Sequence, residues 1–129
     1  MEKIRNNHPE IAPSGATFSR TVRVGNLLFI AGCTARGADA QGGSMLEQLE
    51  VTLDRIMRIV AAEGGVPGDI VKITTFVTSV PAWQENRSGQ EEMFARYFQG
   101  EYPANTLVEI TALAEAGLDV EIEAIAELS

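Results

Sequence analysis

Carboxylates near the C-terminus are the first side chains in this sequence that could support chemistry. Glu121, Glu123 and Glu127 alternate with apolar residues over 119–128. Side chains at even spacing on a strand point to one face, which here also carries Ile125. Like charges so close repel one another unless water, or donors from another subunit, meet them. The pattern therefore fits either an ordinary solvated face or a face that belongs to a site or interface.

The single cysteine is a candidate nucleophile, because thiolates attack electrophilic carbons readily. Cys33 would need a base, and the only histidine, His8, lies in a polar segment just before Pro9. We therefore expect Cys33 to be a small buried side chain at a strand end. One Cys and one His also exclude an internal disulfide and leave too few ligands for a structural zinc site, so no metal site is expected.

The overall charge argues against one class of partner. The 129 residues carry 10 Lys and Arg against 18 Asp and Glu, a formal net charge of -8. Binding a phosphate backbone needs a basic face, so nucleic acid is not expected as a partner. The sequence has no apolar leader and no apolar run of about 18 residues, which predicts a protein without a membrane partner. A thiol without disulfides suits a reducing compartment, so we expect a cytoplasmic location.

The elements that must position these residues form one domain. Residues 1–15 are polar and contain Pro9, Pro13 and Gly15, which predicts an irregular lead-in, and 16–129 are assigned to the domain. Gly25-Asn26 predicts the turn of a hairpin. Strands are expected at 17–24, 27–31, 69–78, 106–113 and 119–128, with a glycine-rich loop over 33–43.

Two helices are predicted between these strands. Ser44 and Glu47 fit a capping box, and apolar residues then recur at helical spacing as far as Gly64-Gly65. Arg55 and Arg58, balanced by neighbouring acidic residues, predict a solvated face on that helix. A second helix is expected over 87–98. The resulting order, β-β-α-β-α-β-β, indicates an α+β fold with helices on one mixed sheet.

The C-terminal third carries a more specific pattern. The segments YPANTLVEI and VEIEAIAEL, nine residues apart, resemble the signature of the RidA/YjgF/L-PSP family of reactive-intermediate deaminases. VGNLLFIAG, GDIVKITTFVTSV and FARYF resemble further motifs of that family, in the same order. The resemblance extends from Phe18 to Leu128.

The resemblance implies a chorismate-mutase-like α+β fold that assembles as a homotrimer, with an inner β-barrel and a cleft at each subunit interface. It implies hydrolysis of 2-imino acids, or of their enamine tautomers, to 2-keto acids and ammonia without a metal or organic cofactor. In that family an Arg after the Pro-Ala of the signature binds the substrate carboxylate. A Glu on the last strand positions the attacking water, and a Tyr, a Ser and often a Cys complete the pocket.

Only part of that site is present in this sequence. Glu121 occupies the position of the water-positioning Glu, whereas Asn105 stands in place of the Arg. Cys33 stands where many members have Gln. The other three pocket positions differ as well, with Phe18, Ala31 and Leu107 in place of Tyr, Ser and Cys.

Replacing the Arg changes what the pocket can bind. Asn offers two donors and one acceptor without charge, whereas Arg offers a charged fork of donors. Charge-assisted hydrogen bonds contribute ~1.5–3 kcal/mol, against ~0.5–1.5 kcal/mol for neutral ones. Because Glu121 and the acidic net charge would also repel an anion, we expect that simple 2-imino acids are not the preferred substrate.

Three interpretations of Asn105 remain open. It could hydrogen-bond a neutral carbonyl, amide or imine of a different substrate. A second cation, Arg36 or Arg20, could bind the carboxylate instead, and Arg36 is favoured because it lies on the glycine-rich loop. The pocket could also bind a small molecule without catalysis.

The sequence thus predicts a homotrimeric, cofactor-free hydrolase that acts on an imine, an enamine or a related small C=N compound. Glu121 would position and deprotonate the attacking water. The rival is a small-molecule-binding trimer of the same fold without activity, and an endoribonuclease activity, known for some relatives, fits the net charge poorly. The expected substrate-binding residues are Asn105, Thr106, Phe18, Ala31, Cys33 and Arg36.

Overall fold

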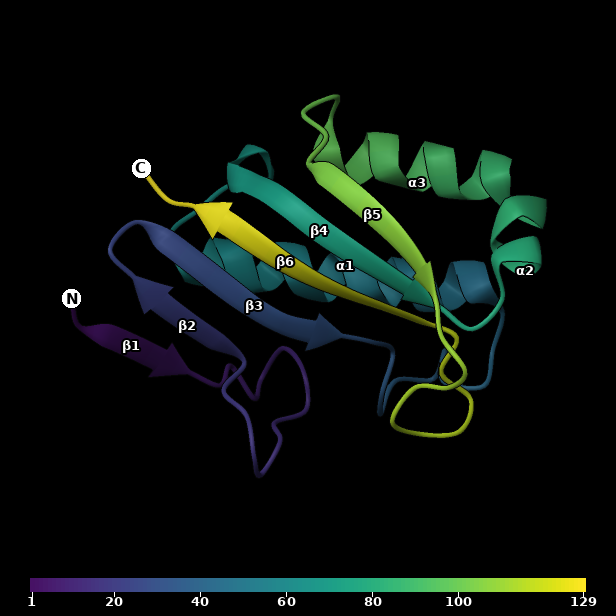
Figure 1. Cartoon of the computed structure of the whole chain (residues 1–129), viewed down its shortest axis with the longest axis horizontal. Helices are drawn as coiled ribbons and strands as arrows, with labels where there is room; N and C mark the ends of the chain where they lie inside the picture. The colour runs from purple at the N-terminus through teal and green to yellow at the C-terminus, as the bar shows by residue number, and fades with distance from the viewer.

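A computed structural model describes residues 1–129, which form a mixed α+β fold (Figure 1). The strands are β1 (Lys3–Asn6), β2 (Thr21–Val24), β3 (Leu27–Cys33), β4 (Ile70–Val77), β5 (Ala104–Glu109) and β6 (Val120–Glu127). The helices are α1 (Met45–Ala62), the short 3-10 turn η1 (Pro67–Asp69), α2 (Val80–Glu85) and α3 (Arg87–Phe98). None of the helices combines the length and the apolar composition needed to cross a bilayer.

The strands form one sheet in the order β1-β2-β3-β6-β4-β5. Only β4 and β5 are parallel, and all other neighbours are antiparallel. Figure 1 shows α1 passing behind the sheet, with α3 beyond it near the β5 edge. The expected hairpin is confirmed, because Val24 pairs with Leu27 across a turn that begins at Gly25 with a φ of 59°.

The core lies between the sheet and α1. Alternate residues of β6 from Val120 to Ala126 are buried, which confirms the alternation predicted from the sequence. The helix places its buried leucines and isoleucines against that face. Its N-terminus carries the predicted capping box, since the Ser44 hydroxyl accepts from the Glu47 N–H and the Ser44 N–H donates to the Glu47 carboxylate, both at 3.2 Å.

The opposite face of the sheet is not covered by a helix. Leu27 and Phe29 are each 41% exposed on β3, whereas Leu28 and Ile30, which alternate with them, are buried. Ile125 pairs with Phe29 on this face, so apolar side chains of adjacent strands meet there. An apolar face of this kind is unusual for an isolated subunit.

The N-terminal residues differ from the sequence prediction. Lys3–Asn6, expected to be irregular, forms β1 and pairs antiparallel with β2. The four residues are exposed and mostly polar, so they lack the alternation that identifies a strand.

The other elements differ from the prediction in smaller ways. The short helix α2 is not predicted, because six residues are too few for helical periodicity. The bounds of α3 agree with the prediction, whereas β2 begins later than expected, at Thr21.

An irregularity in β3 shapes the end of the sheet where the cavity described below lies. Ile30 pairs with Ala124 and Cys33 pairs with Ile122, so β3 has one more residue than β6 over this stretch. Such a β-bulge bends the strand and re-aims the neighbouring groups. The extra residue falls at Ala31-Gly32, and the carbonyl oxygens of both face a buried arginine.

Candidate functional site

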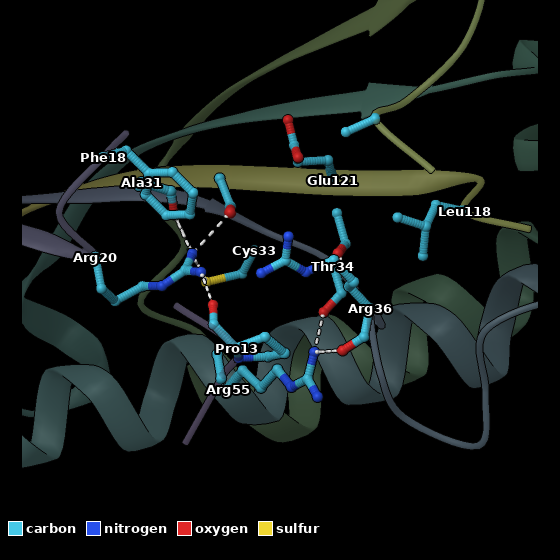
Figure 2. Close-up of a pocket in the computed structure, with 13 residues that line it drawn as sticks. Pro13, Phe18, Arg20, Ala31, Cys33, Thr34, Arg36, Arg55, Leu118 and Glu121 are labelled. Carbon is cyan, nitrogen blue, oxygen red and sulfur yellow. Dashed lines mark hydrogen bonds between the residues drawn. The ribbon is translucent and has the colours of Figure 1, made fainter. Parts of the chain in front are cut away.

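A cavity of about 220 Å³ lies between the N-terminal segment, the end of β3 and the start of β6 (Figure 2). This volume lies below the roughly 300–1,000 Å³ of pockets for drug-sized ligands, so the cavity has room only for a small molecule. Five of the expected site residues line it together: Phe18, Ala31, Cys33, Arg36 and Glu121. Residues not named as site residues at the sequence level also line it, among them Pro13, Thr34, Arg55 and Leu118.

Glu121 is half-buried at the start of β6. Its carboxyl group lies directly over Gly32, because a Cβ on that glycine would stand 2.7 Å from the Glu121 Cδ. Burial, together with repulsion from Glu123, raises the pKa of Glu121, although the charge of Arg20 acts in the opposite direction. A carboxylate with a raised pKa is a better proton acceptor than a free one, and this suits a general base.

Arg20 is only 4% exposed and holds the cavity wall together. Its Nη1 donates to the Gly32 carbonyl at 2.8 Å and its Nη2 donates to the Pro13 carbonyl at 2.9 Å. The guanidinium lies 5.1 Å from the centre of the Phe18 ring, within the range of a cation–π interaction. Its Nε is buried without a hydrogen-bond partner.

Arg36 and Arg55 add two further guanidinium groups. The Arg55 Nη1 donates to the carbonyls of Thr34 and Arg36, both at 2.8 Å, so α1 supports the loop that follows β3. The Arg36 Nη2 donates to the Ser14 carbonyl at 3.1 Å, and its Nη1 lies 3.6 Å from Glu115. Burial lowers the pKa of Arg55; the Cys33 thiol opposes this, and the charges of Arg20 and Arg36 lower it further.

The solvated face predicted for Arg55 and Arg58 is therefore wrong for Arg55. Arg58 is exposed as expected, whereas Arg55 turns to the loop carbonyls and lines the cavity. The sequence carries no signal that separates the two, because the carbonyls that bind Arg55 belong to a loop about 20 residues away along the chain.

Cys33 is 1% exposed, which confirms the expected burial. Burial raises the pKa of its thiol against the opposing charge of Arg20, so the neutral thiol is favoured over the nucleophilic thiolate. The only histidine does not line this cavity, and its Nε2 contacts the Glu63 carboxylate instead. Cys33 is part of the cavity wall and lacks an activating base.

The two signature residues of β5 lie elsewhere in the subunit. Asn105 lines a second, more open cavity of about 450 Å³ with Trp83, Phe94 and Leu107, and its Oδ1 accepts a hydrogen bond from Thr75 at 3.0 Å. The Thr106 hydroxyl accepts from the Lys72 ammonium at 2.8 Å. Within one chain the expected site residues therefore form two groups, one at Glu121 and one on the exposed edge strand.

No three His, Cys, Asp or Glu side chains come together in a group that could hold a metal ion. The two cavities are lined instead by arginine, carboxyl, amide and apolar side chains.

Comparison with known proteins shows which sequences this chain resembles. The family described as endoribonuclease L-PSP matches residues 9–128. A RutC family protein of Pyrococcus horikoshii is 30% identical over 112 residues, which are 84% of this chain and 85% of that protein. The 2-iminobutanoate/2-iminopropanoate deaminase of Capra hircus is 29% identical over 114 residues, 84% of this chain and 78% of that protein.

The similarity extends to three dimensions. The crystal structure of TdcF from E. coli with bound serine superimposes with a TM-score of 0.84 at 25% identity. The superposition covers 98% of this chain and 100% of the other.

Proposed function

Since the chain belongs to the L-PSP endoribonuclease family, the RidA/YjgF group whose motifs its sequence resembles, we propose that it hydrolyses a reactive imine, an enamine or a related small C=N compound. The half-buried Glu121 carboxyl group at the wall of the cavity is the observation that carries this proposal. The Capra hircus relative is named as a deaminase of two imino acids, and TdcF was crystallised with bound serine, a molecule of similar size.

In the proposed reaction the Glu121 carboxyl group moves protons from the attacking water to the substrate nitrogen. Its carboxylate accepts a proton from a water molecule while the water oxygen forms a bond to the imine carbon. The C=N bond becomes a C–N single bond, and nitrogen takes up the proton. The proton of the new hydroxyl group then also passes to nitrogen through the Glu121 carboxylate as the C–N bond breaks and the C=O bond forms. Ammonia leaves, so imine and water give a carbonyl compound and ammonia. An enamine reaches the same path after its tautomerisation to the imine.

We also propose that the protein is a homotrimer and that a second copy supplies the β5 residues. The Asn105 side chain and the Thr106 backbone of one subunit would then complete the cavity of about 220 Å³ that Glu121 lines in its neighbour, here called the Glu121 cavity. This proposal is supported by the exposure of the edge strand β5, where Leu107 is 39% exposed, and by the uncovered apolar face of the sheet. In an oligomer, copies of the same chain can pack on the exposed edge strand and on the apolar face, so that both become buried.

The geometry favours imine hydrolysis over RNA cleavage, despite the name of the family. Phosphodiester cleavage needs an acid–base pair and a basic surface that follows the backbone. The single histidine is bound to Glu63 outside the cavity, and the formal net charge is -8. The small Glu121 cavity admits a small molecule.

The proposal is tested by measuring the release of ammonia from imines generated in solution, with the Glu121→Gln variant beside the wild-type protein. We expect the wild type to accelerate hydrolysis and Glu121→Gln to lose at least about a hundredfold of that rate, since a positioned general base contributes about 10²–10⁴-fold. Glu127→Gln is the control, because Glu127 lies on the same strand face, is exposed outside that cavity and does not act on the pKa of Glu121.

Retained turnover in Glu121→Gln would remove the general base from the mechanism. No turnover of any imine by the wild type, with a small molecule bound in the cavity, would favour the non-catalytic binding protein instead.

A further inference from the structure

The Glu121 cavity has a charge opposite to that of the molecule. Three guanidinium groups, those of Arg20, Arg36 and Arg55, line it against the single carboxyl group of Glu121. The rest of the molecule must be acidic, because the formal net charge is -8. A local excess of cations inside an acidic protein concentrates anions at that point.

Two of the three arginines lack a neutralising partner. The hydrogen bonds of Arg20 end on backbone carbonyls and on the Cys33 sulfur, and those of Arg55 end on backbone carbonyls. Neither forms an ion pair with a carboxylate. The Arg20 Nε is, in addition, buried without any partner. A buried cation that is paired only with neutral groups is costly, and an anion in the cavity would offset this cost.

Arg36 is the arginine that can reach a ligand. Its side chain is 31% exposed, whereas Arg20 is almost fully buried and Arg55 is held by two loop carbonyls. Its carboxylate neighbour, Glu115, is 45% exposed at 3.6 Å, a weak surface pair that a ligand can displace. Figure 2 shows the side chains of Arg20 and Arg36 extending from opposite sides toward the space beside Cys33.

An anion in this cavity cannot lie against an ionised Glu121 without repulsion. The Arg36 side of the cavity is therefore the favourable place for it, and the reacting carbon belongs on the Glu121 side. The anionic group of the ligand would then lie apart from its reacting carbon. This separation differs from that of a simple 2-imino acid, in which the carboxylate is attached directly to the C=N carbon.

We propose that Arg36, supported by Arg20 and Arg55, forms an anion subsite that binds a carboxylate remote from the C=N carbon of the substrate. The substrate class is thus an imine or enamine with a remote anionic group. This inference rests on the proposed deaminase function, and it assigns the anion to arginines of this chain rather than to the position of Asn105. The three guanidinium groups would oppose the repulsion that the acidic net charge exerts on such a substrate.

Binding of two keto acids tests the subsite without any turnover. 2-Oxoglutarate carries a remote carboxylate and 2-oxobutanoate does not. Titration calorimetry of both with the wild-type protein therefore measures what the remote carboxylate contributes to affinity. We expect 2-oxoglutarate to bind at least about tenfold more tightly, and we expect Arg36→Gln to remove this preference, since a charge-assisted hydrogen bond contributes about 10-fold to 100-fold in affinity. Arg36→Lys should retain part of it.

Arg58→Gln is the matched control. It removes the same charge from the exposed face of α1 and does not touch the cavity, so the preference should remain. Circular dichroism and thermal unfolding of each variant show whether it is folded. Equal affinities in the wild type, or a preference that survives in folded Arg36→Gln, would overturn the subsite.

The two proposals fail separately. If Arg36→Gln still binds 2-oxoglutarate more tightly while Glu121→Gln loses turnover, the proposed deaminase function is supported and the anion subsite is contradicted. If Arg36→Gln loses the preference for 2-oxoglutarate while Glu121→Gln still hydrolyses imines, the anion subsite is supported and the general-base role of Glu121 is contradicted.

Discussion

Gly32 determines where the Glu121 carboxyl group lies. The bulge in β3 brings this glycine beneath the carboxylate, and the absence of a side chain leaves the space that the carboxylate fills. The glycine is not required by its backbone, because its φ is not positive. Close approach by Glu121 is the reason for a glycine at this position.

Gly32→Ala should therefore affect activity more than stability. The new Cβ would stand 2.7 Å from the Glu121 Cδ, so the carboxyl group must move, and a displaced general base costs roughly a hundredfold in rate. Steady-state turnover and thermal unfolding of the variant measure the two effects separately.

Gly68→Ala is a suitable control for this change. It also places a Cβ against a glutamate carboxylate, that of Glu101, but outside the Glu121 cavity, and should leave turnover unchanged. Unaltered activity in Gly32→Ala would mean that the position of the carboxylate is not critical.

At the scale of elements, one carboxylate fastens β1 to the domain. The Glu63 Oε2, just after α1, accepts from Asn6, His8 and Thr21, which come from β1, the following turn and β2. Burial alone would raise the pKa of Glu63, but these hydrogen bonds lower it overall. The ionised carboxylate is therefore favoured in the folded protein.

Glu63→Gln should loosen the N-terminal strand. The amide lacks the charge that these donors meet, and weakening charged hydrogen bonds costs about 1–3 kcal/mol. Because the pKa is lowered by folding, the carboxylate contributes stability above its unfolded pKa, and this contribution is lost as pH falls through the folded pKa. Hydrogen exchange of the β1 amides and thermal unfolding between pH 3 and pH 7 measure both effects.

The wild type should lose stability relative to Glu63→Gln as the pH falls through this window. A variant with the same pH profile and the same β1 protection as the wild type would show that Glu63 does not hold the strand.

Local signals allowed most elements to be predicted from the sequence. The capping box at Ser44, the turn at Gly25 and the alternation of β6 each depend on residues a few positions apart, and all three are confirmed. The strand β1 and the role of Arg55 depend on partners remote along the chain, so no local pattern indicates them. The resemblance to a family placed Glu121, Phe18 and Ala31 in one pocket, which composition alone could not do.

At the scale of the whole molecule, the uncovered sheet face and the β5 edge are the surfaces that a homotrimer would use. Leu107→Asp should convert the trimer to a monomer, because it would place a charge in the buried contact proposed for β5. Light scattering coupled to size exclusion measures the mass of each variant.

Val66→Asp is the control, since Val66 is 60% exposed in the loop before η1, outside β5. The trimer should persist in it. A monomeric wild type, or a Leu107→Asp variant that remains trimeric, would contradict the proposed contact.

The contrast between an acidic exterior and a basic cavity has a kinetic consequence. An anionic molecule that diffuses toward the protein is first repelled by the net charge of -8 and is attracted only within about a Debye length of the cavity mouth. Dissolved salt weakens both effects, so it speeds the encounter and shortens the residence of the captured molecule. Ionic strength would thus raise both the association rate and the dissociation rate of an anionic ligand, which have opposite effects on its affinity.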